Sequence, residues 1–346
     1  MISISGLSAN ELTSSKGAKL NISTLREWIA NGAFALNVES VYPTESLPAH
    51  ATIVTGLLPT DHGITANIAF DEHNAIESNQ EAQQTRSIKA DSIMEAAHRE
   101  NLKVANFSFP ISSNNEINFS SIASLLPSYS RKERLSAIKD QDNKTAFEAI
   151  ESLKQNRPEL LLVHFDSYAL SQTYFGVASR EAIDALANID ALLKQIFEAV
   201  TREGLINNTT FIVVSDHGLM KVEHEFSPDS VLIRKGFLKV DQQGNVISWR
   251  AKAQTFGGSA AIYLQNPADE QTARAVEAAF QEIYQQISSP IWRILTRREA
   301  ARLGADPRAF LYLDAAPGLI MTEAKEISTD QKDKSESVMA TGGYLP

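Results

Sequence analysis

Cysteine is absent from the 346 residues of this chain. Its absence excludes disulfide bonds, thiolate nucleophiles and cysteine-bound zinc or iron–sulfur centres, and it leaves the redox environment open. Positive charge is also in short supply, since 32 Lys and Arg face 42 Asp and Glu and the formal net charge is −10. A surface of that sign repels phosphate backbones, so nucleic acid is not an expected partner.

Long hydrophobic runs are missing as well. No apolar stretch reaches the roughly 18 residues that a membrane-spanning helix needs, so no membrane span is expected. The first residues, MISISGL, lack the basic region of a signal peptide and are typical of a strand. As written, the chain is expected to be cytoplasmic, and it would be extracytoplasmic if a leader had been removed.

The sequence does contain an alternation of strands and helices. Three apolar runs end in small or polar residues, at positions 1–5, 160–165 and 211–214. Continuous runs of this length are typical of strands buried on both faces of a parallel sheet. Helical patterns separate them, at positions 21–32, 91–101 and 179–199. Ser23 and Asp91 are the expected N-caps of the first two of these helices. We therefore predict an α/β fold with a doubly wound, mostly parallel sheet flanked by helices.

The pattern changes after about residue 226. Residues 237–249 are typical of two short strands around a Gly-Asn turn. They are followed by strands at 260–264 and 309–313 and by helices at 269–288 and 297–303. This order predicts a smaller α+β lobe at residues 227–326. The lobe is inserted into a core of residues 1–226 plus 327–346.

Asp216 and His217 come directly after the third apolar run and before Gly218. Sites in open α/β sheets form beyond the carboxyl ends of strands, and a carboxylate beside an imidazole suits a divalent metal ion. The residues alone leave an alternative open, in which Asp216 caps the following turn and His217 packs in the interior.

A second candidate lies in residues 41–71. Ser46 precedes Pro48, which suits the first turn of a helix running to about Thr55. The Ser46 hydroxyl would then lie at the positive end of the helix dipole, where a phosphate oxygen is favoured. Asn67 offers an amide that could donate to the same oxygen. Taken singly, Ser46 could equally be an N-cap and Asn67 could satisfy its own turn.

In combination, the strings YPTESLPAHATIVTGLLPTDHGITAN and VVSDHG resemble the type I phosphodiesterase/nucleotide pyrophosphatase branch of the alkaline phosphatase superfamily. TFGGSAAIYL and ATGGYLP extend the resemblance to the lobe and the last residues. The resemblance implies an alkaline-phosphatase-like core and a hydrolase that acts on a phosphate-ester small molecule. In such an enzyme two ions, zinc by resemblance, support an in-line displacement through a covalent intermediate.

The resemblance also implies roles for individual residues. Ser46 falls at the nucleophile, which in the family binds the first ion as well. Asn67 falls at the position that contacts the phosphoryl oxygen. Asp216 and His217 fall at two further ligands of the first ion, and His50 and His62 at positions expected to pack or hydrogen bond locally.

Four other ligand positions depart from the family pattern. Ser5 stands where the first site has an Asp, and Gly342 stands where the family has a His before Gly-Tyr. Ala169 and Thr173 stand at the Asp and His of the second site. The side chains of Ala, Thr and Gly cannot hold a dication against water, so the second site is expected to be lost.

The remaining set is Ser46, Asp216 and His217, fewer than the about four ligands that zinc prefers. We therefore expect at most one divalent metal site, or none, and impaired catalysis. Two alternatives remain open. One is an active metal-dependent phosphoric ester hydrolase, with Ser46 as nucleophile and one metal on Asp216 and His217. The other is a non-catalytic binding module.

The chain ends inside the GGYLP motif, where the family continues through a further strand. The core is therefore expected to be truncated and to expose a sheet edge. An exposed edge can pair with another chain, which makes a homo-oligomer an expected partner arrangement.

Overall fold

The computed structural model describes residues 1–13, 20–36, 38–70, 88–112, 129–323 and 339–344. By their contacts the residues form two compact units. The first unit comprises Met1–Ser40, Ile53–Thr55 and Gln84–Leu219, and the second comprises Val41–Thr52, Gly56–Gln83 and Met220–Pro346. The domain boundaries expected from the sequence stay a prediction, because these units group residues by contact alone.

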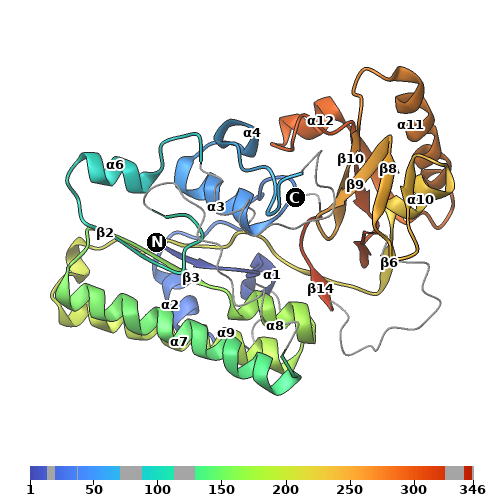
Figure 1. The fold of residues 1–346 in the computed structure, drawn as a ribbon. Helices are drawn as coiled ribbons and strands as arrows, with labels where there is room; N and C mark the ends of the chain where they lie inside the picture. The colour runs from blue at the N-terminus through green and yellow to red at the C-terminus, as the bar shows by residue number, and fades with distance from the viewer. Residues whose placement is uncertain (14–19, 37, 71–87, 113–128, 324–338, 345–346) are drawn as a thin grey trace. The chain divides into compact units, whose positions relative to one another are not determined.

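The first unit is built on a four-stranded sheet, in which every pair of neighbours is parallel (Figure 1). Its strand order is β2 (Val104–Phe107), β3 (Leu160–Phe165), β1 (Ile2–Ile4) and β4 (Val213–Val214). Ile2 in β1 lies level with Val163 on one side and Val213 on the other. The predicted parallel sheet is confirmed, although β4 is shorter than the apolar run that predicted it.

Helices cover this sheet with apolar side chains. α2 (Ser23–Asn31), α7 (Arg131–Gln155) and α9 (Arg180–Arg202) share one hydrophobic core with β1 and β3. α6 (Ile93–Arg99) contacts β2, and α1 (Ala9–Thr13) and α8 (Ser167–Phe175) follow β1 and β3. The sequence did not predict α7. Its many charged residues make the apolar pattern weak, although Ala146, Ala149 and Leu153 are buried in the core.

The predicted N-cap of α2 was wrong. Ser23 is the first helical residue, and the residue before it makes no side-chain capping bond. Instead the carboxylate of Asp190, in α9, accepts hydrogen bonds from the backbone N–H groups of Thr24 at 3.0 Å and Leu25 at 2.8 Å. These are among the N–H groups that a helix start leaves without partners.

The predicted N-cap of α6 was also wrong, by one residue. Ser92 rather than Asp91 caps this helix, and its side chain accepts from the backbone N–H of Glu95. The Glu95 carboxylate accepts from the Ser92 backbone N–H in return, at 3.1 Å. This reciprocal pair is a capping box, whose Ser-x-x-Glu spacing was visible in the sequence.

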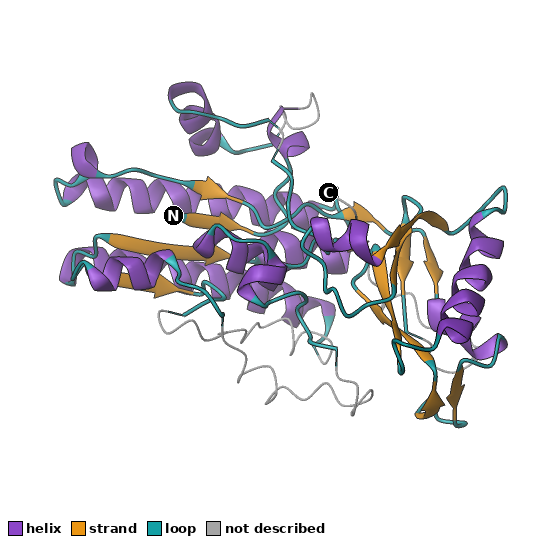
Figure 2. Cartoon of the chain, turned by 90° about the horizontal axis from the view of Figure 1, so that it is seen from above, coloured by secondary structure: helices purple, strands orange, loops and turns teal. Residues whose placement is uncertain are grey.

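The second unit contains an antiparallel sheet (Figure 2). Its order is β11 (Ile291–Thr296), β12 (Leu311–Ala315), β10 (Ser259–Leu264) and β9 (Ala251–Thr255). Alternate residues of β10 point to opposite faces, as a strand requires. Ile262 packs with the helices α10 (Pro228–Arg234) and α11 (Glu270–Tyr284), and Tyr263 belongs to a separate cluster.

Shorter elements complete the second unit. β7 (Leu238–Val240) and β8 (Val246–Trp249) form the predicted hairpin. β6 (His224–Phe226) pairs with β13 (Leu319–Met321), and β5 (Met220–Lys221) pairs with β14 (Ala340–Thr341). α12 spans Arg297–Arg302, α4 spans Pro59–His62, and α3 spans Ser46–Thr55 as predicted. Within the described ranges, none of the helices has both the length and the hydrophobicity to cross a membrane.

Candidate functional site

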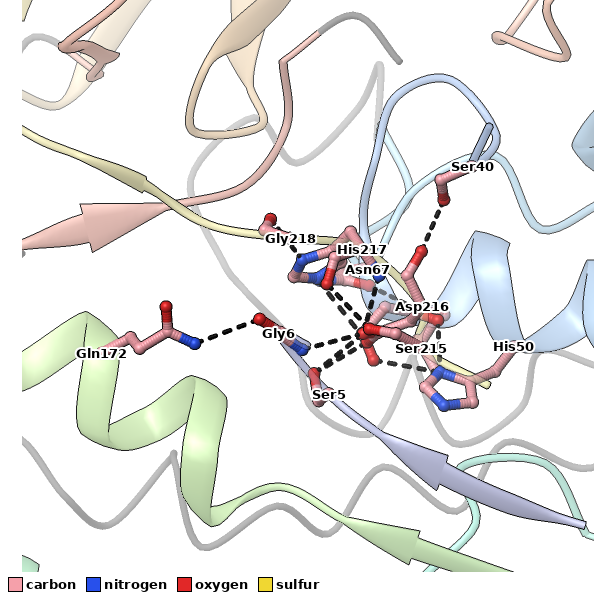
Figure 3. Close-up of polar contacts among 12 residues, drawn as sticks. Ser5, Gly6, Ser40, His50, Asn67, Gln172, Ser215, Asp216, His217 and Gly218 are labelled. Carbon is pink, nitrogen blue, oxygen red and sulfur yellow. Dashed lines mark hydrogen bonds and ion pairs between the residues drawn. The ribbon is translucent and has the colours of Figure 1, made fainter. Parts of the chain in front are cut away.

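In the first unit, the Asp216 carboxylate accepts hydrogen bonds from three groups of the chain itself (Figure 3). The Ser5 hydroxyl donates to its Oδ1 and Oδ2, at 3.1 and 2.9 Å. The backbone N–H groups of Gly6 and His217 donate to Oδ1, at 3.3 and 2.8 Å. Asp216 is 2% exposed and Ser5 is 3% exposed. Water is thus almost excluded from this carboxylate, and hydrogen-bond donors of the chain take its place.

Sheet topology explains why Ser5 meets Asp216. β1 and β4 are parallel neighbours, so the residues that follow them lie at the same edge of the sheet. Gly6 pairs with Gly218 in an isolated bridge just beyond the two strands. Sequence reasoning named positions 5 and 216 separately. The hydrogen bond between them needed the strand order, which no motif contains.

Gly6 lets α8 pack closely against the end of β1. Its φ of 78° is in the left-handed region, and a Cβ there would lie 2.7 Å from Leu219 Cδ1 and 3.0 Å from Ala169 Cα. The Gln172 side chain donates to the Gly6 carbonyl at 3.1 Å (Figure 3). Only glycine satisfies both the conformation and the close contact.

Position 169 therefore lies beside the end of β1, but Ala169 brings only a methyl group there. The nearest acid along the chain is Asp166, which follows β3 directly. Burial, with smaller contributions from the charges of Asp216 and Asp142, raises the pKa of Asp166 to about 7. An acid with so high a pKa is a poorer metal ligand at neutral pH than an ordinary carboxylate.

His217 has the geometry of a metal-binding histidine on one side of its ring. Its Nδ1 lies 3.1 Å from the Gly218 carbonyl oxygen, which can only accept, so Nδ1 carries the proton. In the neutral ring Nε2 then holds the lone pair, 3.6 Å from Oδ2 of Asp216. The His217 side chain is 13% exposed. An N–H bond to a carbonyl is the usual way in which the second ring nitrogen orients a metal ligand.

The second unit contains the other two predicted site residues. Ser46 is the first residue of α3, after Glu45, and makes no capping bond as an N-cap would. The Asn67 side-chain oxygen accepts from the Leu47 N–H at 2.8 Å, and the Asn67 N–H donates to Glu45 Oε2 at 2.8 Å. Because its oxygen takes the helix N–H, the nitrogen of the Asn67 amide must point away from Leu47.

His50 lies one helical turn after Ser46 and is fully buried. Its Nδ1 is 3.1 Å from Ser46 Oγ and 2.7 Å from the Ser46 carbonyl oxygen. His62 is also buried, with Nε2 3.0 Å from Thr52 Oγ1 and Nδ1 accepting from the Ile64 N–H at 3.2 Å. The i, i+4 spacing of Ser46 and His50 was the signal that could have predicted their contact.

The residues around position 342 make hydrogen bonds to Thr44, close to Ser46 in the chain. The Gly343 N–H donates to the Thr44 carbonyl at 3.0 Å, and Thr44 Oγ1 donates to the Tyr344 carbonyl at 2.8 Å. The Gly258 N–H donates to the Gly342 carbonyl at 2.8 Å. The C-terminal motif thus packs against residues 44 and 258 within the second unit, and position 342, where the resemblance predicts a histidine, carries no side chain.

A pair of dications does not fit the residues present. Ala169, Thr173 and Gly342 offer no ligand of the usual kind. Across the described ranges, no three His, Asp or Glu side chains converge as a metal site requires. Of the ligand residues that the resemblance predicts, two with a metal-binding side chain remain. They are His217 and Asp216, whose Nε2 and Oδ2 face each other.

The parallel sheet, its covering helices and the described α+β elements define an alkaline-phosphatase-like α/β protein. A family model described as type I phosphodiesterase / nucleotide pyrophosphatase matches residues 1–338. The chain belongs to this family.

Relatives support the same assignment. Human ectonucleotide pyrophosphatase/phosphodiesterase family member 1 is 28% identical over 222 residues, which are 63% of this chain and 23% of the relative. Venom phosphodiesterase 2 of Crotalus adamanteus is 26% identical over 225 residues, 64% of this chain and 27% of the relative. The aligned part thus spans about a quarter of the length of these curated relatives.

Solved structures show the shared fold. Human ectonucleotide pyrophosphatase/phosphodiesterase 5 matches with a TM-score of 0.69 and 18% identity, over 99% of this chain and 83% of that one. An inactive form of the murine protein in complex with AMP matches with a TM-score of 0.67 over the same shares.

Proposed function

We propose that this chain is a phosphodiesterase-like protein that binds a phosphate-ester small molecule, and that its two-metal catalysis is impaired. The observation that carries the proposal is the Ser5–Asp216 hydrogen bond. At the position where the family has a carboxylate, Ser5 provides a neutral donor. A neutral donor stabilises the Asp216 carboxylate without a cation, whereas two facing carboxylates would require one.

The binding half of the proposal rests on Ser46 and Asn67. Both lie at the start of α3, and the Asn67 oxygen accepts from the helix N–H, which turns its amide nitrogen away. A nucleoside monophosphate is the ligand class we propose, because a murine structural neighbour was solved in complex with AMP. Family resemblance is the reason for placing Asp216 and His217 in the same site as Ser46.

Restoring the lost ligands tests the catalytic half. The variant carries Ser5→Asp, Ala169→Asp, Thr173→His and Gly342→His together. We expect the wild-type protein to hold less than one metal ion per chain by elemental analysis after incubation with zinc, and not to hydrolyse an aryl phosphodiester. The restored variant should hold more zinc and gain hydrolysis that depends on the metal.

The control is the same variant with Ser46→Ala, in which any gained hydrolysis should disappear because the nucleophile is gone. Wild-type protein that bound two zinc ions and turned over the substrate would refute the proposal. Circular dichroism of each variant establishes that the substitutions leave the fold intact.

The second candidate is a hydrolase with one metal on Asp216 and His217. It is favoured by the His217 ring, whose Nδ1 lies 3.1 Å from the Gly218 carbonyl oxygen while Nε2 lies 3.6 Å from Oδ2 of Asp216. It predicts one zinc ion per wild-type chain and slow hydrolysis that His217→Ala and Ser46→Ala both abolish. AMP binding with neither metal nor hydrolysis would refute this second candidate.

A further inference from the structure

The contacts of the buried His50 ring determine which of its nitrogens carries the proton. Nδ1 lies 2.7 Å from the backbone carbonyl oxygen of Ser46, and a carbonyl oxygen can only accept. Nδ1 must therefore be protonated in the neutral ring. Ser46 Oγ, 3.1 Å from the same nitrogen, receives a share of that N–H.

This tautomer excludes one role for His50 and permits another. The ring has no lone pair on Nδ1, so it cannot take the Ser46 proton through that atom as a general base would. A hydroxyl that accepts one hydrogen bond keeps its own O–H free to donate in another direction. Because His50 is fully buried, water does not compete for its N–H.

We propose that His50 is a positioning residue that donates from Nδ1 to Ser46 Oγ and so directs the Ser46 O–H toward an oxygen of the bound phosphate ester. The identity of that ligand rests on the function proposed above. In this chain Ser46 then acts as a hydrogen-bond donor to the ligand. The Asn67 amide donates beside it, from the turn that caps the same helix.

His62, in the same segment, provides an internal comparison. Its Nδ1 accepts from the Ile64 N–H, so its proton lies on Nε2, 3.0 Å from Thr52 Oγ1. The two buried histidines are therefore expected to have opposite tautomers, although only twelve residues separate them along the chain. One spectrum can report on both.

The first test is nitrogen-15 NMR of the full chain labelled at histidine, with His50→Asn and His62→Gln used for assignment. We expect a protonated Nδ1 in His50 and a protonated Nε2 in His62 at neutral pH. Ser46→Ala removes Oγ but keeps the carbonyl, so the His50 N–H resonance should shift while that of His62 stays. An unprotonated Nδ1 in His50, or no shift in Ser46→Ala, overturns the proposal.

The second test is a double-mutant cycle on AMP binding, measured by calorimetry. His50→Leu should weaken binding about 3- to 10-fold, the usual range for one lost hydrogen bond. His50→Asn keeps an N–H donor near the position of Nδ1 and should restore most of it. In the Ser46→Ala background, His50→Leu should have no further effect, because His50 acts through Ser46. Equal losses in both backgrounds overturn the proposal.

The two tests also separate this inference from the proposed function. If the wild-type protein does not bind AMP, the ligand class is wrong. The NMR experiment still decides whether His50 donates to Ser46, since it requires no ligand.

Discussion

At the scale of single residues, the exchange of a carboxylate for a hydroxyl at position 5 has the largest chemical consequence. Two carboxylates at adjacent strand ends repel each other unless a cation lies between them. Ser5 removes one of the charges and donates to the other at 2.9 Å. The ends of β1 and β4 are then joined by this hydrogen bond, on which the proposed impairment rests.

His62 makes protein stability depend on pH. Burial lowers the pKa of His62 from 6.5 to about 4. As the pH falls from 7 to 5, the unfolded chain takes up a proton on His62 and the folded chain does not, so folding stability decreases. We expect His62 to contribute a loss of about 1–2 kcal/mol over this interval, measured by urea unfolding at the two pH values.

His62→Gln is the matched variant for this prediction. Its side-chain amide can still donate to Thr52 Oγ1, but it has no proton to gain. Other buried groups titrate too, and burial raises the pKa of Asp142 to about 7. Their contributions are common to both proteins. An equal loss of stability in wild type and His62→Gln would contradict the assignment to His62.

At the scale of secondary-structure elements, α2 depends on a residue far away in the sequence. Asp190 accepts from two N–H groups at the start of α2 and is 4% exposed. Asp190→Ala removes both acceptors and leaves the N–H groups buried. We expect it to lower the free energy of unfolding by about 1–3 kcal/mol, measured by urea denaturation.

Ser23→Ala is the control, because Ser23 is already helical and its substitution should change stability by less than about 0.5 kcal/mol. If Ser23→Ala cost as much as Asp190→Ala, the cap would be local and the assignment to α9 would be wrong. The two variants together show whether the start of α2 is capped by its own residue Ser23 or by Asp190 of α9.

At the scale of the whole molecule, the family ligand positions are divided between the two compact units. Positions 5, 169, 173, 216 and 217 belong to the first unit, and positions 46 and 342 belong to the second. Among these positions the His and Asp side chains are Asp216 and His217, and both lie in the first unit.

This division leads to a prediction about thermal stability. A ligand that binds only the folded state raises Tm by mass action. We expect the Tm of the wild-type protein to be the same, within about 1 °C, with zinc and with a chelator. The variant with all four ligands restored should gain several degrees with zinc. A saturable rise in wild type that His217→Ala removes would favour the single-metal hydrolase instead. The expected homo-oligomer stays a prediction, which size-exclusion chromatography at several concentrations can test.

The sequence by itself determined the class of fold and the positions at which to look for chemistry. Apolar runs at residues 1–5 and 160–165 predicted buried parallel strands, because only such strands need an apolar side chain on both faces. The segment around Ser46 and the pair Asp216 and His217 predicted the family. The strands follow from hydrophobic pattern and the family from resemblance of short motifs, and neither requires knowledge of the contacts.

Only the tertiary structure decided what those residues do for one another. It placed the Ser5 hydroxyl on the Asp216 carboxylate and the Asp190 carboxylate at the start of α2. Both contacts join residues more than 160 positions apart, and strand order and helix packing bring them together. The contact of His50 with Ser46 lies within one turn of α3, and the tertiary structure adds the burial that keeps water from the His50 ring.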